Sequence, residues 1–169
     1  MRDPKLAIRP ARAEDADNIL AGLRGIAETI GKPHKVKATA DDIRRCGFGD
    51  RPAFSVLIAE TDSTFAGMCL YFPIFSSWLA QPGVYVQDLF VDEKFRGLNI
   101  GEKLLRHLAR NVAAQGGAYL ELVVDSENFR AQRFYERIGL PHRDDDHVHR
   151  ITGEAFLDFA NNDKPEGEQ

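Results

Sequence analysis

The fold is decided by Phe95-Arg96-Gly97-Leu98-Asn99-Ile100-Gly101, which joins a run of strand-forming residues to an amphipathic helix. The preceding run, residues 84–91, is rich in β-branched and aromatic side chains and has the length of a strand. After it, small and apolar residues recur at the spacing of one buried helical face: Gly101, Leu104, Leu105, Leu108, Ala109 and Val112. Gly116-Gly117 ends this predicted helix. The stretch is therefore predicted to be a strand-to-helix connection.

This connection has the composition of an anion-binding loop. Gly97 and Asn99 enter left-handed backbone conformations at low cost, and Gly101 has no Cβ to block a close approach, so consecutive amides can turn toward one anion. A pyrophosphate there would meet the unpaired N–H groups of the new helix, and Arg96 would add a charged contact. An ordinary strand-to-helix turn explains the same glycines, so the loop alone leaves both interpretations open. The sequence patterns of nucleoside-triphosphate loops and dinucleotide folds are absent from it.

A second motif follows the next predicted strand, residues 119–124. It reads Asn128-x-x-Ala-x-x-Phe-Tyr135-x-x-x-Gly-Leu, ending at Leu140. Together with the first motif, it resembles the paired signature of the GNAT superfamily of N-acetyltransferases. The resemblance implies that the first motif holds the pyrophosphate of acetyl-CoA, that Asn128 contacts the pantetheine region and that Tyr135 lies near the sulfur. Asn99 stands where Gly is commonest in the family, and we expect the loop to keep its shape because Asn tolerates a positive φ.

Nearly the whole chain resembles one branch of this superfamily, the diamine (spermidine/spermine) and thialysine acetyltransferases. The likeness is carried by Ile8-Arg9-Pro10-Ala11 and by residues 67–79 and 85–91. Two features depart from the diamine enzymes: Gln87-Asp88 replaces Glu-Asp, and Ser76-Ser77 replaces an acid before the tryptophan. Fewer carboxylates attract a polycation more weakly. The resemblance therefore implies amine acetylation and leaves a polyamine acceptor open. By analogy with the branch, we also expect a homodimer.

Bulk properties are typical of a single soluble enzyme domain. The 169 residues are 43% hydrophobic, which is enough to build a core. Since no apolar run could span a bilayer and the first residues lack the apolar segment of a secretory signal, we expect a cytoplasmic protein without membrane contact. The net charge of −4 argues against nucleic-acid binding. We expect one N-acetyltransferase domain over residues 1–160 and a disordered polar tail over residues 161–169.

The pattern of elements predicts an α/β (α+β) fold. We expect a strand at residues 6–9, a helix at 14–30, a short helix capped by Thr39, and a hairpin of residues 54–60 and 64–75. Residues 144–152 and 154–159 are candidates for the last strands. The resemblance implies a mixed, twisted sheet flanked by helices, whose central parallel strands splay apart near Val91 and Val124.

The splayed gap suits a pantetheine arm that pairs with the backbone of β-strand residues as an added strand. Such pairing would place the acetyl carbonyl against a main-chain amide that stabilises the oxyanion. The residues implied to bind the cofactor are Leu89, Phe90, Val91, Arg96, Gly97, Leu98, Asn99, Ile100, Gly101, Asn128 and Tyr135.

The chemistry requires two proton movements. The acceptor ammonium, with a pKa of about 10.4, must lose a proton before attack, and the candidate bases are Asp88, acting through ordered water, and Glu28. The leaving thiolate needs a proton or a hydrogen bond, and the family analogy assigns it to Tyr135. The phenol has a pKa of about 10 and the thiol a pKa of about 8.5, so complete proton transfer to the thiolate is unfavourable by roughly 2 kcal/mol. A hydrogen bond from the phenol would therefore provide much of the stabilisation of the thiolate. Tyr135 also has a packing interpretation beside Phe134, which the surrounding motif disfavours.

The acceptor site implied by the resemblance comprises Glu28, Trp78, Gln87 and Asp88. Trp78 is interpreted either as a loop anchor or as a wall of this pocket. The sequence leaves three functions open: a small-molecule amine N-acetyltransferase, a peptide or protein N-acetyltransferase, and a non-catalytic acyl-CoA sensor.

Two clusters have simpler explanations than ligand binding. His147 and His149 would share one face of a strand beside Asp144-Asp145-Asp146, but an acidic turn followed by a polar strand explains the same residues, so we expect no metal. The basic residues Lys32, His34, Lys35 and Lys37 are typical of a solvated loop, with the 3′-phosphate of CoA as the alternative contact.

Overall fold

The computed structural model describes residues 5–145 and 147–161, which fall into two units, Met1–Ala131 and Gln132–Gln169. The first unit contains the sheet, and the second contains the end of one helix and a further short helix. Asp146 and residues 162–169 of the predicted tail lie outside the described residues, whereas Asn161, the first residue of that tail, ends a helix. The single domain over residues 1–160 stays a prediction.

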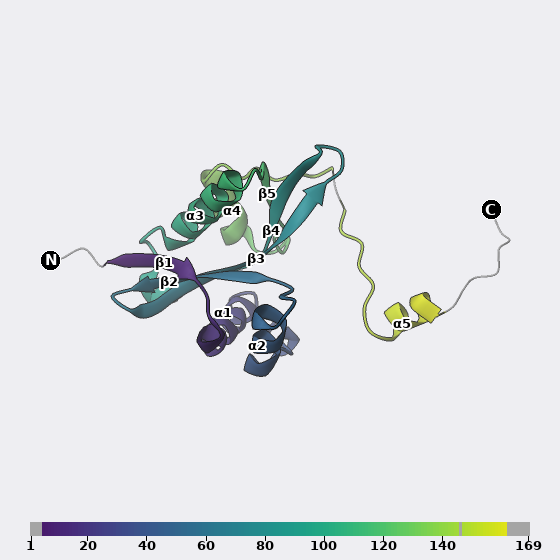
Figure 1. Ribbon diagram of the computed structural model, residues 1–169, viewed down its shortest axis with the longest axis horizontal. Coiled ribbons are helices and arrows are strands. Elements are labelled where there is room, and N and C mark those ends of the chain that lie inside the picture. The colour runs from purple at the N-terminus through teal and green to yellow at the C-terminus, as the bar shows by residue number, and fades with distance from the viewer. Residues whose placement is uncertain (1–4, 146, 162–169) are drawn as a thin grey trace. The chain divides into compact units, whose positions relative to one another are not determined.

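A five-stranded mixed sheet, in the order β1-β2-β3-β4-β5, forms the first unit (Figure 1). The first four strands pair antiparallel in chain order, and β5 pairs parallel with β4. The strands are β1 Leu6–Pro10, β2 Ser55–Thr61, β3 Thr64–Ser76, β4 Gln81–Val91 and β5 Tyr119–Leu122. The predicted hairpin is confirmed, because β2 and β3 pair antiparallel up to Thr61 and Thr64. Asp62 and Ser63 form its turn, with φ of 49° and 65°, values that small polar residues adopt in turns. The predicted mixed sheet is also confirmed.

Helices cover both faces of this sheet (Figure 1). They are α1 Ala16–Thr29 and α2 Ala40–Phe48 on one face, and α3 Ile100–Ala114 on the other. Short 3₁₀ turns precede or follow them: η1 Ala13–Asp15, η2 Pro33–Lys35 and η3 Glu93–Phe95. The predicted cap of α2 is confirmed, since the Thr39 hydroxyl accepts the Asp42 N–H at 3.2 Å and the Asp42 carboxylate accepts the Thr39 N–H at 3.0 Å. This reciprocal pair satisfies two N–H groups at the helix start.

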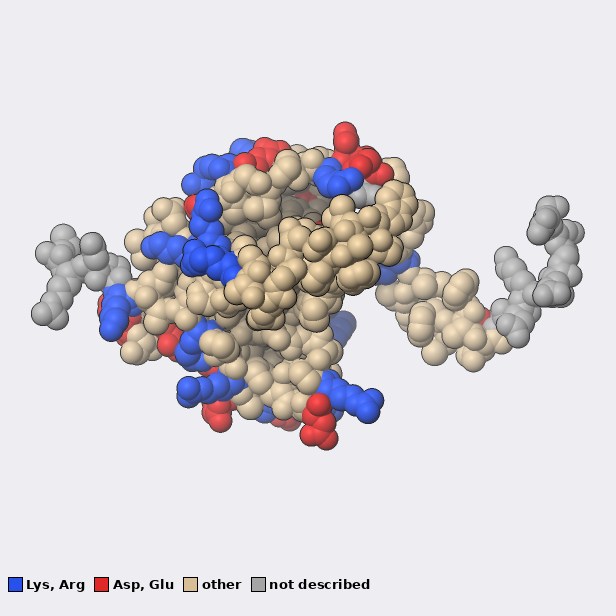
Figure 2. Space-filling model, turned by 45° about the horizontal axis from the view of Figure 1, so that its top comes forward, with Lys and Arg blue, Asp and Glu red and all other residues tan. Residues whose placement is uncertain are grey.

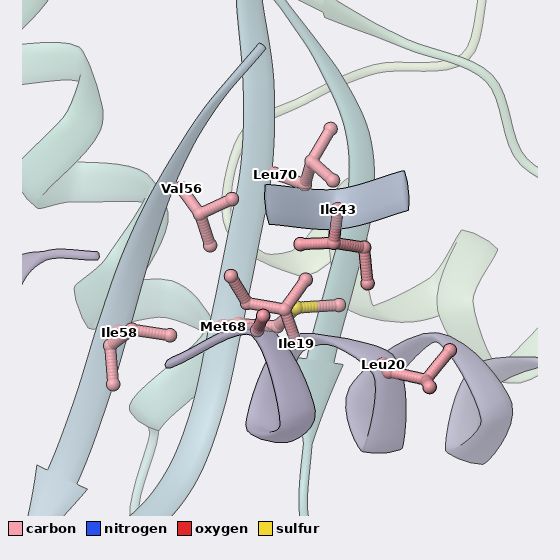
Figure 3. Packing of buried hydrophobic residues seen from close by; sticks show 8 residues of the cluster. Ile19, Leu20, Ile43, Val56, Ile58, Met68 and Leu70 are labelled. Carbon is pink, nitrogen blue, oxygen red and sulfur yellow. The ribbon is translucent and has the colours of Figure 1, made fainter. Parts of the chain in front are cut away.

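The core lies between α1, α2 and the sheet. One buried cluster contains Ile19 of α1, Ile43 of α2, Ile58 of β2 and Met68 of β3. In Figure 3, Ile19 lies over Met68 and Ile43 lies nearer to Leu70 of the same strand. On the opposite face, the buried residues Leu104, Leu105 and Leu108 of α3 carry the predicted apolar stripe. Both helical layers therefore bury one face against the sheet and hold its strands in place.

A charged network ties β1 to α1 and β2. The Arg9 guanidinium donates to both carboxylate oxygens of Asp15, at 2.7 and 2.9 Å, and to Glu60 at 2.6 Å. Asp15 is almost fully buried, and the hydrogen bonds from Arg9 lower the pKa of its carboxyl. A buried carboxylate needs such a partner, because an unpaired charge there is strongly unfavourable.

The prediction of strands after Gly139 is wrong. The described residues between 141 and 153 form no strand, and the helix α5 Glu154–Asn161 occupies the second candidate segment. All described side chains from residue 141 to 161 are exposed, so the polar and apolar alternation there gains no burial that would favour a strand. Ala155, Leu157 and Ala160 have high helix propensity, which favours the observed helix. No helix within residues 5–145 and 147–161 is long and apolar enough to cross a membrane.

Candidate active site

The candidate site starts where β4 and β5 part. The two strands pair from Gly83 and Tyr119 to Val86 and Leu122, and the pairing ends there although β4 continues to Val91. The predicted splaying of the parallel strands is confirmed, with β5 ending at Leu122 instead of near Val124. The last part of β4 therefore pairs with β3 on one side and, among the described residues, with no strand on the other, which we call its open edge.

The backbone direction at this open edge follows from one hydrogen bond. The N–H of Asp92 donates to the carbonyl of Ala66 on the β3 side, at 2.9 Å. Because successive N–H groups of a strand point to opposite sides, the groups of Phe90 point toward β3, and those of Leu89 and Val91 point to the open edge. These two N–H groups are thus oriented to pair with an added extended chain.

A β-bulge interrupts β4 beside this edge. Leu70 pairs with Asp88 and Tyr71 with Val86, so Gln87 is an extra residue on β4. Bulges bend a strand and redirect its side chains, and they are frequent next to active sites. The bulge could not be predicted, since no glycine or other local signal marks it in the sequence.

Asp88 lies on the face of the sheet that α1 and α2 cover. Its register partner Leu70 belongs to the core cluster on that face. Burial raises the pKa of Asp88 to about 6. Burial also raises the pKa of the Cys69 thiol to about 12, and the charge of Asp88 adds to that shift. Asp88 is consequently ionised at neutral pH and is a stronger base than an ordinary carboxylate.

Helix α1 approaches β4 closely through a glycine. A Cβ added at Gly25 would lie 2.4 Å from Cε2 of Phe90, so only glycine allows the observed contact. Glu28 follows three residues later on α1, on the same side of the helix, and its side chain is exposed. The predicted acceptor residue Glu28 therefore lies on the helix that packs against β4.

The loop after β4 has the predicted backbone conformation. Gly97 and Asn99 have φ of 86° and 56°, and α3 begins at Ile100 with Ile100 and Gly101 buried. Nothing lies within 4 Å of a Cβ added at Gly97, so its conformation, and not space, favours glycine there. Arg96, expected to contact a phosphate, forms an ion pair with Glu93. The side chain of Leu98 is exposed.

The second motif begins in the first unit. The Asn128 side-chain oxygen accepts the N–H of Ala131 at 3.1 Å, which caps the helix α4 Phe129–Arg137. The side chain of Tyr135, in the second unit, packs edge-on against Phe134 with ring centroids 5.1 Å apart. Tyr135 is half-buried.

Trp78 lies at the connection between β3 and β4. Its side chain is 98% exposed, so it does not anchor this loop within the chain. The run from Thr64 to Gln87 contains no Asp, Glu, Lys or Arg. A broad area without such side chains crosses the face shown in Figure 2.

The interpretation of His147 and His149 as one strand face is wrong. Both residues lie outside regular secondary structure and are exposed. Across the part of the chain that the structure describes, no group of three His, Cys, Asp or Glu side chains is arranged to hold a metal ion.

Comparison with known proteins agrees with this geometry. Residues 23–140 match the acetyltransferase (GNAT) family. The chain is 31% identical to thialysine N-epsilon-acetyltransferase of Sus scrofa over 164 residues, covering 90% of this chain and 96% of the relative. It is 28% identical to the human spermidine/spermine N(1)-acetyltransferase-like protein 1, covering 90% of this chain and 23% of that protein.

A solved structure shares the fold. An integron cassette protein from V. cholerae superposes with a TM-score of 0.78 at 22% identity, covering 93% of this chain and 98% of that one.

The family match over residues 23–140 and the identity to the thialysine acetyltransferase show that the chain belongs to the GNAT family. It is an N-acetyltransferase that uses acetyl-CoA as cosubstrate.

Proposed function

We propose that this N-acetyltransferase moves the acetyl group of acetyl-CoA to a primary amine of a small molecule, such as a diamine, polyamine or thialysine-like compound, by direct attack of the amine. The observation that carries the proposal is the end of β4 beyond its pairing with β5, where the N–H groups of Leu89 and Val91 point away from β3. In this proposal the pantetheine arm pairs with these residues, and one N–H stabilises the oxyanion of the tetrahedral intermediate.

The pyrophosphate would bind at the start of α3. The left-handed residues Gly97 and Asn99 precede a helix whose first N–H groups are available to an anion. Arg96 would exchange its exposed partner Glu93 for the phosphate, which is a modest change because surface ion pairs contribute little free energy. Asn128 would cap α4 with its side chain while lying close to the pantetheine region.

Asp88 is the proposed general base, acting through ordered water. Its pKa of about 6 keeps it ionised at neutral pH and brings it closer to the operating pH than an ordinary carboxylate. Tyr135 is the proposed hydrogen-bond donor to the leaving thiolate, and Glu28, Trp78 and Gln87 are the proposed acceptor contacts. Much of the rate enhancement would come from alignment of the amine with the thioester.

A peptide or protein acceptor is the second candidate. The fully exposed Trp78 favours it, since a side chain that closes a small pocket would be expected to lose more of its exposure. We also retain the proposals of a cytoplasmic location and a homodimer. The exposed apolar side chains of Phe75, Trp78 and Leu79 support a self-association surface.

The test is turnover with a panel of acceptors. Purified protein would be incubated with acetyl-CoA and with spermidine, cadaverine, thialysine, free amino acids or a lysine peptide, and thiol release would be followed. We expect saturable turnover with a small amine and a loss of about a hundredfold in kcat for Tyr135→Phe. Tyr119→Phe, which removes a phenol from the paired part of β5, is the matched control and should keep full activity.

Two outcomes would contradict the proposal. Turnover with the peptide alone would favour the second candidate. Acetyl-CoA binding without turnover on any amine would instead favour the acyl-CoA sensor.

A further inference from the structure

A hollow of about 320 Å³ lies between β1 and α3, on the face of the sheet that α3 covers. One wall is apolar and comes from Leu6 and Ile8 of β1, whose side chains are half-buried. The other wall comes from α3 and consists of ionisable side chains: Lys103, Arg106, His107 and Arg110. Both walls belong to the first unit. The volume lies at the lower end of the range for small-ligand pockets.

The ionisable side of α3 faces away from the strands proposed to hold the coenzyme. Its four residues follow the three- and four-residue spacing of one side of a helix. Val112 lies about two and a half turns beyond Lys103, and therefore on the opposite side of the helix. That side approaches the chain before β5, because a Cβ added at Gly117 would lie 2.3 Å from Cγ1 of Val112. The hollow is thus at the β1 edge of the sheet, whereas β4 and β5 lie at the other end of the strand order.

Few carboxylates on α3 offset the charge of this wall. Glu102 is the acidic residue of α3, and it accepts the Nε–H of Arg106 at 2.8 Å. Among the described residues, no carboxylate forms an ion pair with Lys103, His107 or Arg110. No Asp or Glu follows Lys103 in the sequence before Glu121. The helix therefore presents net positive charge to the hollow.

The strands beside the hollow change this balance little. β1 contains no Asp or Glu, and the β2 residues opposite its two apolar side chains are the uncharged Thr61 and Ala59. Glu60 lies between them and on the other face of the sheet. Asp62 follows in the turn and accepts the backbone N–H of Lys5 at 3.2 Å, while the side chain of Lys5 adds a positive charge. Among the described residues around the hollow, two carboxylates thus stand against four lysine and arginine side chains.

This arrangement is unfavourable for α3 by itself. Cations three and four positions apart on a helix repel one another. The positive end of the helix dipole disfavours a cation near the start of α3, where Lys103 lies, and the last turn, which favours cations, has no basic residue. A bound anion would reduce this repulsion. Arginine and lysine are also the side chains that form charge-assisted hydrogen bonds with phosphates and carboxylates.

We propose that the hollow between β1 and α3 binds a compact anion with at least two negative charges, carried by phosphate or carboxylate groups, at a site separate from that of the coenzyme. The small volume favours a small ligand over a macromolecule, and the net charge of −4 disfavours nucleic acid. The proposal does not depend on which acceptor the enzyme acetylates.

The experiment measures anion binding while the coenzyme site is filled. Tripolyphosphate or citrate would be titrated into CoA-saturated protein in magnesium-free buffer and followed by calorimetry. Bound CoA occupies the proposed pyrophosphate loop of residues 97–101, so an anion that still binds uses another site. We expect one anion to bind per chain, and to bind more weakly as the salt concentration rises. Tighter binding of tripolyphosphate would identify a phosphate ligand, and tighter binding of citrate a carboxylate ligand; either supports the proposal.

A matched pair of substitutions then tests the site. Arg110→Gln should raise the Kd of the preferred anion about tenfold, because it removes a charged hydrogen-bond donor from the hollow. Arg24→Gln makes the same change on α1, which covers the other face of the sheet, at an exposed side chain without an ion pair among the described residues. This control should leave the Kd unchanged. Equal CoA affinity in the wild type and both variants would show that the fold is intact.

Three results would overturn the inference. Neither anion could bind saturably to the CoA-saturated protein. The anions could bind only to CoA-free protein, which would assign them to the coenzyme site. Arg110→Gln and Arg24→Gln could raise the Kd equally, which would indicate attraction to the overall charge and not to a site. Each of these results would leave the proposed function standing, because none of them measures acetyl transfer.

Discussion

Replacement of Asp88 by asparagine should make the protein more stable above about pH 6 while reducing its activity. Burial raises the folded-state pKa of Asp88 to about 6, whereas an aspartate in an unfolded chain has a pKa of about 3.9. The folded protein therefore binds more protons than the unfolded chain between these values, and its stability falls as the pH rises through them. Asparagine has the same size and cannot ionise.

The size of the effect follows from the pKa difference. A difference of about two units, at about 1.36 kcal/mol each, gives an upper value of roughly 3 kcal/mol. Because Asp88 is only half-buried, solvent screens part of this electrostatic effect. We therefore expect the free energy of unfolding of the variant to exceed that of the wild type by about 2 kcal/mol. Relative to the wild type, Asp88→Asn should gain this stability between about pH 4 and pH 7.

The assay is urea unfolding of both proteins across this pH range, together with acetyl transfer measured on the same samples. Turnover of the wild type should decline below about pH 6, as Asp88 takes up a proton, and the variant should be slow throughout. Asp50→Asn, which removes one exposed carboxylate, is the control for the loss of a negative charge. Parallel stability curves for the wild type and Asp88→Asn would refute the reasoning.

Three further substitutions test the packing and the loop. Asp15→Asn should destabilise the fold by about 2–4 kcal/mol in urea unfolding, because Arg9 loses the buried carboxylate that pairs with it; an effect below about 0.5 kcal/mol would contradict this. Gly25→Ala should lower stability by about 1–3 kcal/mol although alanine favours helices, since its Cβ meets Phe90, and a gain in thermal stability would oppose the close-approach argument. Asn99→Ala should raise KM for acetyl-CoA, because the observed φ of 56° costs alanine about 1–2 kcal/mol, whereas Asn99→Gly should leave KM unchanged. Equal KM values for the two variants in titrations of acetyl-CoA would count against this loop conformation.

Local patterns predicted the elements of the first unit well. The Thr39 cap depends on residues three positions apart, and the left-handed Gly97 and Asn99 depend on their own side chains. Such features need no knowledge of distant parts of the chain. The sheet faces could also be predicted, because apolar spacing identifies which side of a helix or strand is buried.

Features that depend on distant residues escaped prediction. The Lys32 ammonium forms an ion pair with the Asp125 carboxylate, 93 positions away, so no local pattern predicts where the basic segment of residues 32–37 lies. The bulge at Gln87 arises from the register with β3 and has no local signal. After Gly139, polar and apolar alternation was interpreted as strands, but no sheet edge buries those residues and helix propensity decides the structure of α5.

Direct attack at the open edge of β4 is tested most directly by initial rates measured while acetyl-CoA and one amine acceptor are varied together. The account predicts amine-dependent release of CoA with intersecting double-reciprocal lines, because both substrates must be bound at once for the acetyl group to pass between them. Parallel lines would indicate an acetyl-enzyme intermediate and would contradict the proposed mechanism.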